Sequence, residues 1–225
     1  ARAFAAMSFR HYSAVLGDPV SIVSLKNSLL LGTGGATLGV ALSFFVAYAI
    51  VKIKSRSSGF LESLSFLSFS FPGIVVGIGF MWFFVQTPLY ATIWALLIGY
   101  IATYLPYGIR PLTSAFVQIH ANLEESSRVC GGGPFYTMRR IVLPLLVPGI
   151  VSGWILMATM FLRELSLSVV LSRPGTEVLA VQILRFAEDG LWGRLSALGI
   201  VMIGISTTLV VITTLLGKRL TAVKS

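Results

Sequence analysis

Long apolar runs separated by short polar or charged stretches occupy most of the chain after residue 26. Five of these runs are close to 20 residues long, the length that a helix needs to cross the roughly 30 Å hydrocarbon core of a bilayer. The predicted spans are residues 27–51, 64–85, 89–110, 141–162 and 195–217. The pattern therefore predicts an all-α membrane protein with about five transmembrane helices in one domain, residues 27–217.

Composition agrees with this prediction and excludes several classes of protein. Hydrophobic residues make up 56% of the chain and charged residues 11%, whereas a typical soluble domain carries about 25% charged residues. The single cysteine, Cys130, excludes an internal disulfide, and no clustered Cys/His spacing indicates a metal site. No nucleophile–base pair indicates an enzyme. We therefore expect no catalytic residue, no cofactor and no bound metal.

The basic residues predict how the spans are oriented. With five spans, most of them fall on the side that holds the loop between the third and fourth spans: Lys52, Lys54, Arg56, Arg110, Arg128, Arg139, Arg140, Lys218, Arg219 and Lys224. The positive-inside rule makes this side cytoplasmic, so we expect a multi-pass protein of a bacterial-type inner (plasma) membrane. The net charge of +9 then reflects topology, and we expect contact with lipid rather than with nucleic acid.

The same topology assigns the two ends of the chain. Residues 1–26 form an extracytoplasmic segment, which either lies in the membrane interface or has no fixed structure. No earlier span delivers this segment across the membrane, so we expect the natural protein to extend further at its N-terminus. Residues 218–225 form a cytoplasmic tail.

A polar stretch, residues 121–140, separates the third and fourth predicted spans. Asn122 can cap a short helix, with Glu125 three residues later as its capping-box partner, so we expect a helix over residues 123–130. Three successive glycines end this helix, and Pro134 suits the first position of a second one. The pattern predicts helix, sharp turn and helix at the cytoplasmic surface. A simple connector lying on anionic lipid is the alternative.

The spacing within this stretch carries a motif. Glu125-Ser126-Ser127 is followed after three residues by Gly131, and after nine more by Ile141, one residue, and Leu143-Pro144. This resembles the EAA loop, E-A-A-x3-G-x9-I-x-L-P, of binding-protein-dependent ABC importer permeases, with serines in place of both alanines. In that family the loop forms a coupling helix, which docks on a cytoplasmic ATPase dimer and transmits its closure to the membrane helices. The resemblance implies this coupling role here and a type I importer permease (MetI-like) fold.

Other segments, among them "FLRELSLSVVLSRPGTEVLAVQIL", resemble the ferric-iron branch of these permeases. Members of that branch usually carry two such units in one chain, whereas this sequence shows one EAA-like loop and no internal repeat. The resemblance implies either the C-terminal half of a longer permease or a half-size permease that pairs with a separate subunit. It also implies an extracytoplasmic substrate-binding protein and ferric iron as the solute, with thiamine, phosphonate, polyamine and sulfate left open.

The source of energy for transport is predicted to lie outside this chain. The spans carry no Asp, Glu, Lys or His in their interiors, whereas ion-coupled transporters place such residues inside the bilayer. The chain also lacks the pattern G-x-x-x-x-G-K-[ST] that binds nucleotide phosphates. We therefore expect a separate ATPase. A channel or membrane scaffold subunit without an ATPase is the alternative from a different class.

Candidate pathway residues lie at a charged pair and at helix breaks. Arg163 and Glu164 follow the fourth span, with Ser166 close behind. Charges at membrane depth either face a cavity or partner, or form a local ion pair that reaches the interface. Pro72-Gly73 in the second span and Pro106 in the third predict bends or breaks, which line the pathway in many transporters. The candidates for a pathway or gate are Arg163, Glu164, Ser166, Pro72 and Gly73.

Two further groups have simpler interpretations. The acidic residues Glu177, Glu188 and Asp189 either meet a basic face of the binding protein or face solvent. Five aromatic residues are interpreted as residues of the membrane interface or of helix packing: Trp82, Trp94, Trp192, Tyr90 and Tyr100.

Overall fold

The computed structural model describes residues 10–53 and 57–222 of the 225-residue chain. All regular structure in this part of the chain is helical, so the predicted all-α class is confirmed. The elements in chain order are α2 (Arg10–Leu16), α3 (Pro19–Leu29), η1 (Leu30–Gly35), α4 (Ala36–Lys52), α5 (Ser57–Phe66), η2 (Leu67–Ser70), α6 (Gly73–Phe84), α7 (Ile93–Gln118), α8 (Ala121–Val129), α9 (Pro134–Thr137), η3 (Met138–Val142), α10 (Leu143–Leu162), α11 (Ser166–Leu171), α12 (Leu179–Glu188) and α13 (Trp192–Ala222).

Three continuous helices in the described residues are long and apolar enough to cross a membrane. They are Pro19–Lys52, which joins α3, η1 and α4; Pro134–Leu162, which joins α9, η3 and α10; and Trp192–Gly217 within α13. These helices contain the first, fourth and fifth predicted spans.

The first of these helices begins earlier than the predicted span. The carboxylate of Asp18 accepts a hydrogen bond from the Ser21 N–H at 2.9 Å, and Pro19 occupies the first helical position. Both features favour the start of a helix. Residues 1–9 of the predicted N-terminal segment lie outside the described residues, and the remainder folds into α2 and the first turns of α3.

The second and third predicted spans have different outcomes. Residues 64–85 do not form one helix, because the chain leaves helical conformation at Phe71-Pro72 between η2 and α6. Proline disfavours helical backbone in the residue before it, so the predicted break is confirmed and a single second span is wrong. The third predicted span corresponds to α7, which begins at Ile93 and continues to Gln118, and which is not among the three helices apolar enough to cross a membrane. Since α7 continues through both Pro106 and Pro111, the predicted interruption at Pro106 is not a helix break.

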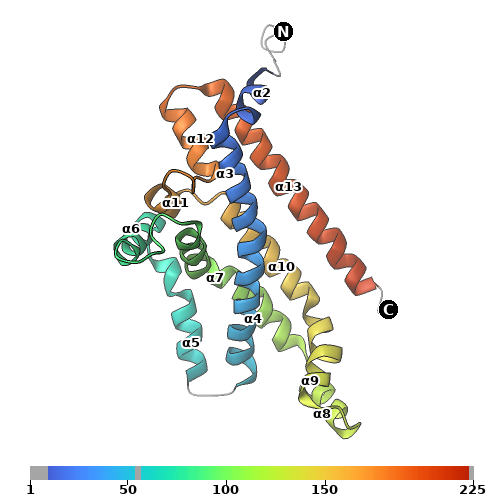
Figure 1. Ribbon diagram of the computed structural model, residues 1–225. Helices are drawn as coiled ribbons and strands as arrows, with labels where there is room; N and C mark the ends of the chain where they lie inside the picture. The colour runs from blue at the N-terminus through green and yellow to red at the C-terminus, as the bar shows by residue number, and fades with distance from the viewer. Residues whose placement is uncertain (1–9, 54–56, 223–225) are drawn as a thin grey trace.

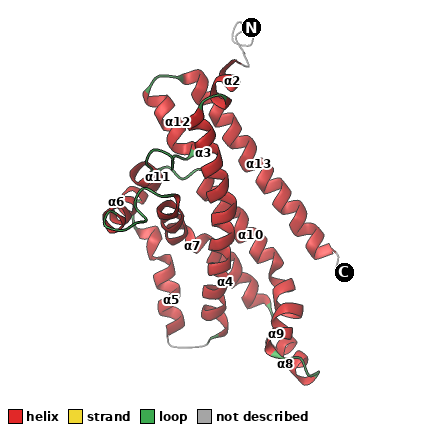
Figure 2. Ribbon diagram, viewed as in Figure 1, coloured by secondary structure: helices red, strands yellow, loops and turns green. Residues whose placement is uncertain are grey.

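The helices form an elongated bundle with two distinct ends (Figure 1). α8, α9 and the C-terminal end of α4 lie at one end, which we call the elbow end, while α2 and α12 lie at the other. α4, α7 and α10 pack against one another in the middle, and α13 packs on α10, α12 and α2. Figure 2 shows that short loops join the helices, with the longer ones around α6, α11 and α12.

Glycines allow the central helices to approach closely. A Cβ atom at Gly149 of α10 would lie 2.7 Å from the Cβ of Ala115 and 3.0 Å from the carbonyl oxygen of Pro111, both in α7. A Cβ atom at Gly32 of η1 would lie 2.9 Å from Cγ of Leu162, at the end of α10. Small residues at such crossings let helix backbones pack tightly within a membrane. Two sides of α10 are therefore held by close contacts.

Candidate functional site

The EAA-like motif folds into a helix, a tight turn and a second helix, which we call the elbow (α8 to α9). α8 ends in a turn in which the Gly131 N–H donates to Arg128 O at 2.9 Å and the Gly132 N–H donates to Ser127 O at 2.8 Å. Gly131 has a φ of +81°, in the left-handed region that glycine adopts without a steric penalty. The glycine of the motif is therefore the residue that turns the chain.

The three glycines of the turn have different surroundings. A Cβ atom at Gly132 would overlap Oγ of Ser127 and lie 2.8 Å from its carbonyl oxygen. Nothing lies within 4 Å of a Cβ atom built at Gly133, and its φ of −69° is open to any residue. The turn therefore requires glycine at 131 for conformation and at 132 for space, but not at 133.

The start of α8 differs from its prediction. The helix begins at Ala121, directly after His120 in extended conformation, and no side chain caps it. The predicted Asn122 cap and its capping box with Glu125 are therefore wrong. Ile119 is buried between the end of α7 and the start of α8. α8 therefore begins next to a packed apolar residue rather than at a side-chain cap.

The serine that replaces the second alanine of the motif has a partner. Ser127 is buried, and its Oγ lies 2.7 Å from Oγ1 of Thr137 in α9. The Thr137 hydroxyl also donates to Gly133 O at 3.1 Å. Sequence reasoning missed Thr137; the only signal for it was a polar residue ten positions after a serine that departs from the motif. The bond joins α8 directly to α9.

The motif residues divide between a groove and a helix. Ser126, Ser127, Gly131 and Ile141 line a groove of about 560 Å³ at the elbow. Leu143 and Pro144 form the start of α10, within the continuous helix Pro134–Leu162. Glu125 is exposed on α8 and is not part of the groove lining. The structure therefore brings the central motif residues together and connects them to a long apolar helix.

Apolar side chains are exposed on both helices of the elbow. Val129 is 88% exposed and Phe135 is 77% exposed, and Leu123 and Tyr136 are exposed as well. Exposed apolar groups gathered on two short helices indicate a surface that another molecule covers. The elbow thus has the properties of a docking surface.

Among the pathway candidates, Glu164 has the clearest environment. It is 6% exposed, and its carboxylate accepts a hydrogen bond from the Tyr104 hydroxyl and another from the Leu167 N–H, each at 2.5 Å. The Ser168 hydroxyl donates to Glu164 O at 2.9 Å, and Ser168 Oγ also lies 2.5 Å from the Tyr100 hydroxyl. We call these residues the Glu164 cluster (Tyr100, Tyr104, Glu164, Leu167 and Ser168).

This cluster distinguishes between the alternatives for two candidates. Arg163 is exposed, and its guanidinium contacts Met160 Sδ at 3.7 Å rather than Glu164. The alternative of a local Arg163–Glu164 ion pair is therefore wrong. Tyr100 is fully buried and its ring lies 5.2 Å from that of Phe161, which agrees with the helix-packing interpretation. Sequence reasoning missed Tyr104, because its partner lies 60 residues away in the chain.

The remaining candidates meet beside this cluster. A Cβ atom at Gly73, the first residue of α6, would lie 3.0 Å from Cβ of Ser166, the first residue of α11. One turn further along α6, a Cβ atom at Gly77 would lie 3.3 Å from Cα of Leu167. The break at Pro72 therefore places α6 directly against α11. Pro72, Gly73, Ser166 and Glu164 lie in one region, while Arg163 points elsewhere.

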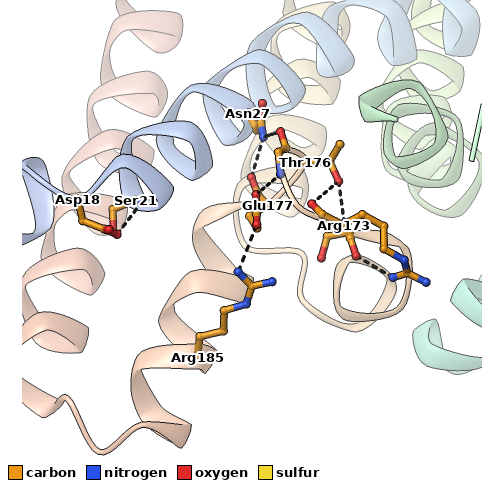
Figure 3. A network of polar contacts seen from close by, with 9 residues as sticks. Asp18, Ser21, Asn27, Arg173, Thr176, Glu177 and Arg185 are labelled. Atoms are coloured by element: carbon orange, nitrogen blue, oxygen red, sulfur yellow. Dashed lines mark hydrogen bonds and ion pairs between the residues drawn. The ribbon is translucent and has the colours of Figure 1, made fainter. Parts of the chain in front are cut away.

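A third polar network holds residues 172–178, which we call the α11–α12 loop (Figure 3). Glu177 is buried, and its carboxylate accepts bonds from the Gly175 N–H at 2.8 Å and from Arg185 at 3.3 Å. The Asn27 side chain donates to the carbonyl oxygens of Gly175 and Glu177. Glu177 is therefore not available to a binding protein, whereas Glu188 and Asp189 are exposed.

Comparison with known proteins identifies the family. Residues 39–222 match the family described as "Binding-protein-dependent transport system inner membrane component". The chain belongs to this family. It is therefore a permease subunit of an ABC importer and an integral protein of the inner membrane, as the EAA-like motif predicted.

Curated relatives differ in length and in solute. The chain is 23% identical over 207 residues to the spermidine/putrescine transport system permease protein PotC of Escherichia coli (strain K12), covering 92% of this chain and 78% of PotC. It is 28% identical over 202 residues to the ferric transport system permease protein FbpB of Actinobacillus pleuropneumoniae, covering 88% of this chain and 29% of FbpB. The names of these relatives do not single out one solute.

Solved structures confirm the predicted fold. The chain is similar to a bacterial ABC transporter involved in the import of the acidic polysaccharide alginate, with a TM-score of 0.77, 18% identity, and coverage of 95% of this chain and 84% of that chain. It is also similar to the MetNI methionine ABC transporter in an inward-facing conformation, with a TM-score of 0.69, 15% identity, and coverage of 91% and 95%. The MetI-like permease fold is thus shown.

Proposed function

We propose that the elbow of this permease docks on a cytoplasmic ABC ATPase dimer and transmits its closure into the membrane. The observation that carries this proposal is the continuity of the elbow with the helix Pro134–Leu162, 29 residues long and apolar. A short helix fixed to the start of a span can pass a rigid-body movement into it. The exposed Val129 and Phe135 supply apolar area for the partner.

We place the elbow end in the cytoplasm and the α11–α12 loop toward the extracytoplasmic side. Arg128, Arg139 and Arg140 lie at the elbow, and Lys52 lies at the same end of the bundle. Basic residues concentrate in cytoplasmic loops of membrane proteins. In this orientation α13 runs toward the cytoplasm, in agreement with a cytoplasmic tail at residues 218–225.

Two further partners belong to this proposal. An extracytoplasmic substrate-binding protein delivers the solute, and a second permease unit completes the pathway, either on the same chain or as a separate subunit. The family description supports the first partner. Relatives of similar length and much longer relatives both occur, so both arrangements of the second unit are retained.

For the solute we propose ferric iron, with a polyamine as the second candidate. The similarity to FbpB supports iron, and the coverage of most of PotC supports a polyamine. Thiamine, phosphonate and sulfate stay as wider alternatives. ATP turnover by the complete transporter decides between them, because only the correct solute-loaded binding protein is expected to stimulate it.

The docking proposal is tested by purifying the full-length permease in detergent and measuring the ATP hydrolysis that it retains. The double variant Glu125→Lys with Gly131→Leu is expected to lose the ATPase while inserting into the membrane as the wild type does. Gly133→Ala is the matched control, since its position is sterically open. Equal retention by the wild type and the double variant contradicts the docking role. Retention by neither the wild type nor the double variant also contradicts docking of the ATPase at the elbow.

A further inference from the structure

The helix Pro19–Lys52 extends from the elbow end deep into the opposite half of the bundle (Figure 1). Its 34 residues correspond to about 50 Å at 1.5 Å per residue. Both of its halves carry polar side chains that bond to segments far away in the sequence. This helix therefore contacts both the elbow end and the opposite half of the bundle.

At the elbow end, the attachment is an ion pair. Nζ of Lys52, the last residue of α4, lies 2.6 Å from Oε1 of Glu124 in α8, and the two side chains are only 19% and 24% exposed. Partly shielded ion pairs are screened less by salt than exposed ones. Glu124 is the neighbour of Glu125 but lies on a different face, turned toward α4 rather than outward. Sequence reasoning assigned no role to Glu124.

Aromatic contacts support the same end of the helix. The rings of Phe44 and Tyr48 in α4 lie 5.5 Å and 5.9 Å from the ring of Phe116, near the end of α7. Phe116 is buried and lies just before the turn into α8. The C-terminal half of α4 thus packs against the end of α7 that leads into α8.

In the opposite half, the attachment is a set of hydrogen bonds to the α11–α12 loop (Figure 3). Nδ2 of Asn27 donates to Gly175 O at 3.1 Å and to Glu177 O at 2.9 Å. Oγ of the next residue, Ser28, accepts a hydrogen bond from the Leu179 N–H at 2.8 Å. Adjacent side chains of one helix therefore hold both the loop and the first residue of α12.

Between these attachments, the helix packs closely against α10. A Cβ atom at Gly35 would lie 3.0 Å from the ring of Phe161, and the Trp154 side chain donates to Oγ1 of Thr37 at 3.0 Å. Closely packed helices move past one another by small shears rather than by free sliding. A displacement of α8 is thus expected to tilt this helix together with α10.

We propose that the helix Pro19–Lys52 transmits the state of α8 to the α11–α12 loop, through the Lys52–Glu124 ion pair at one end and the Asn27 and Ser28 bonds at the other. This inference rests on the proposed docking of an ATPase at the elbow. It adds a route that bypasses the Gly131 turn and reaches the side on which the binding protein docks. Coupling of this kind requires an element with contacts at both sites, and this helix has them.

The route is tested with a spin label on the α11–α12 loop of the complete transporter. In a Cys130→Ser background, Pro174→Cys provides an exposed labelling position. The mobility of the label is compared between nucleotide-free and ATP-vanadate-trapped transporter in lipid nanodiscs. We expect a nucleotide-dependent change that is lost in Lys52→Glu and in Glu124→Lys. The double exchange, Lys52→Glu with Glu124→Lys, is expected to restore it.

Controls separate this inference from the docking proposal. Glu62→Lys makes the same charge change at an exposed position of α5 and is expected to keep the response. Retained ATP hydrolysis, measured on the same samples, reports whether the ATPase is docked. If a charge variant loses the ATPase itself, the variant Asn27→Ala tests the route at its other end. Loss of the nucleotide-dependent response in this variant, with the ATPase retained, supports the route. A response that persists in Asn27→Ala, or in both charge reversals, overturns it.

Discussion

The elbow and the Glu164 cluster both interrupt an apolar chain with polar groups, but they are built in opposite ways. At the elbow a positive-φ glycine turns the chain, one buried contact between Ser127 and Thr137 joins the two helices, and apolar side chains face outward. In the cluster each carboxylate oxygen of Glu164 has a donor, and the residue is buried.

The difference indicates that one region fixes the arrangement of helices and that the other binds a partner. Buried polar groups with all their partners fix one arrangement of the elements that supply them. Exposed elements with few contacts open easily and are available to partners. The Glu164 cluster therefore fixes the junction of α7, α10 and α11, while the elbow meets another molecule. Variants that change one of these regions and leave the other intact test this difference.

The largest effect on stability is expected for Glu164→Ala. The substitution leaves the Tyr104 hydroxyl and the Leu167 N–H without acceptors. Each buried polar group left unpaired costs about 1–3 kcal/mol, so the free energy of unfolding is expected to fall by roughly 3 kcal/mol. Thermal denaturation in detergent measures the loss, and Glu164→Gln, which keeps one acceptor oxygen, is expected to lose less. An alanine variant that melts with the wild type contradicts a holding role.

Gly132→Ala is expected to disrupt the elbow without unfolding the bundle. The added methyl group overlaps Ser127, whose backbone forms the turn, and such overpacking costs about 1–3 kcal/mol. We expect loss of the retained ATPase with a fall of only a few degrees in the melting temperature, because the cost is confined to the elbow. Gly133→Ala adds the same methyl group in open space and is expected to behave as the wild type. Equal behaviour of the two variants would show that the packing of the turn does not matter.

Gly131→Ala is expected to have a moderate effect, because alanine in the left-handed region costs about 1–2 kcal/mol. Gly131→Asn is the matched variant, since asparagine tolerates this conformation better than alanine does. ATP turnover of the purified complex is expected to fall in the order wild type, asparagine, alanine. The reverse order of the two variants would rule out backbone conformation as the reason for glycine.

Ser127→Ala is expected to have the smallest effect, although it removes the bond to Thr137. The Thr137 hydroxyl keeps its acceptor at Gly133 O, so the net loss is expected near 1 kcal/mol or below. Thr137→Val instead leaves the buried Ser127 hydroxyl without this partner and is expected to cost more. Thermal denaturation and ATP turnover compare the two. A larger loss in Ser127→Ala than in Thr137→Val would contradict this account of the pair.

Features with a short sequence signal were predictable. The apolar runs predicted the all-α class, and Pro72 predicted the break before α6. Gly131 was placed correctly at the end of α8, because a glycine after a short helix favours a left-handed cap. The register of the EAA-like motif predicted the family, as residues 39–222 show. Each of these signals lies within a stretch of about 20 residues or fewer.

Features that depend on distant contacts were not predictable. Tyr104 and Glu164 lie 60 residues apart, and Asn27 and Glu177 lie 150 residues apart. The charge of Glu164 suggested either a cavity or partner, or an ion pair with its neighbour Arg163. The ion pair is not formed, and only the fold brings the Tyr104 hydroxyl within reach. Of the bend or break predicted at Pro106, the break is wrong, since α7 continues through this residue, which is buried within the bundle.

The central claim, that the elbow is a cytoplasmic docking surface, is tested most directly at Cys130. This residue is the only cysteine of the chain, and it is exposed in the elbow groove. Sealed membrane vesicles of both orientations are treated with a membrane-impermeant maleimide, with and without the ATPase bound. We expect labelling only in inside-out vesicles, and protection when the ATPase is present. Labelling from the opposite side, or equal labelling with and without the ATPase, would contradict it.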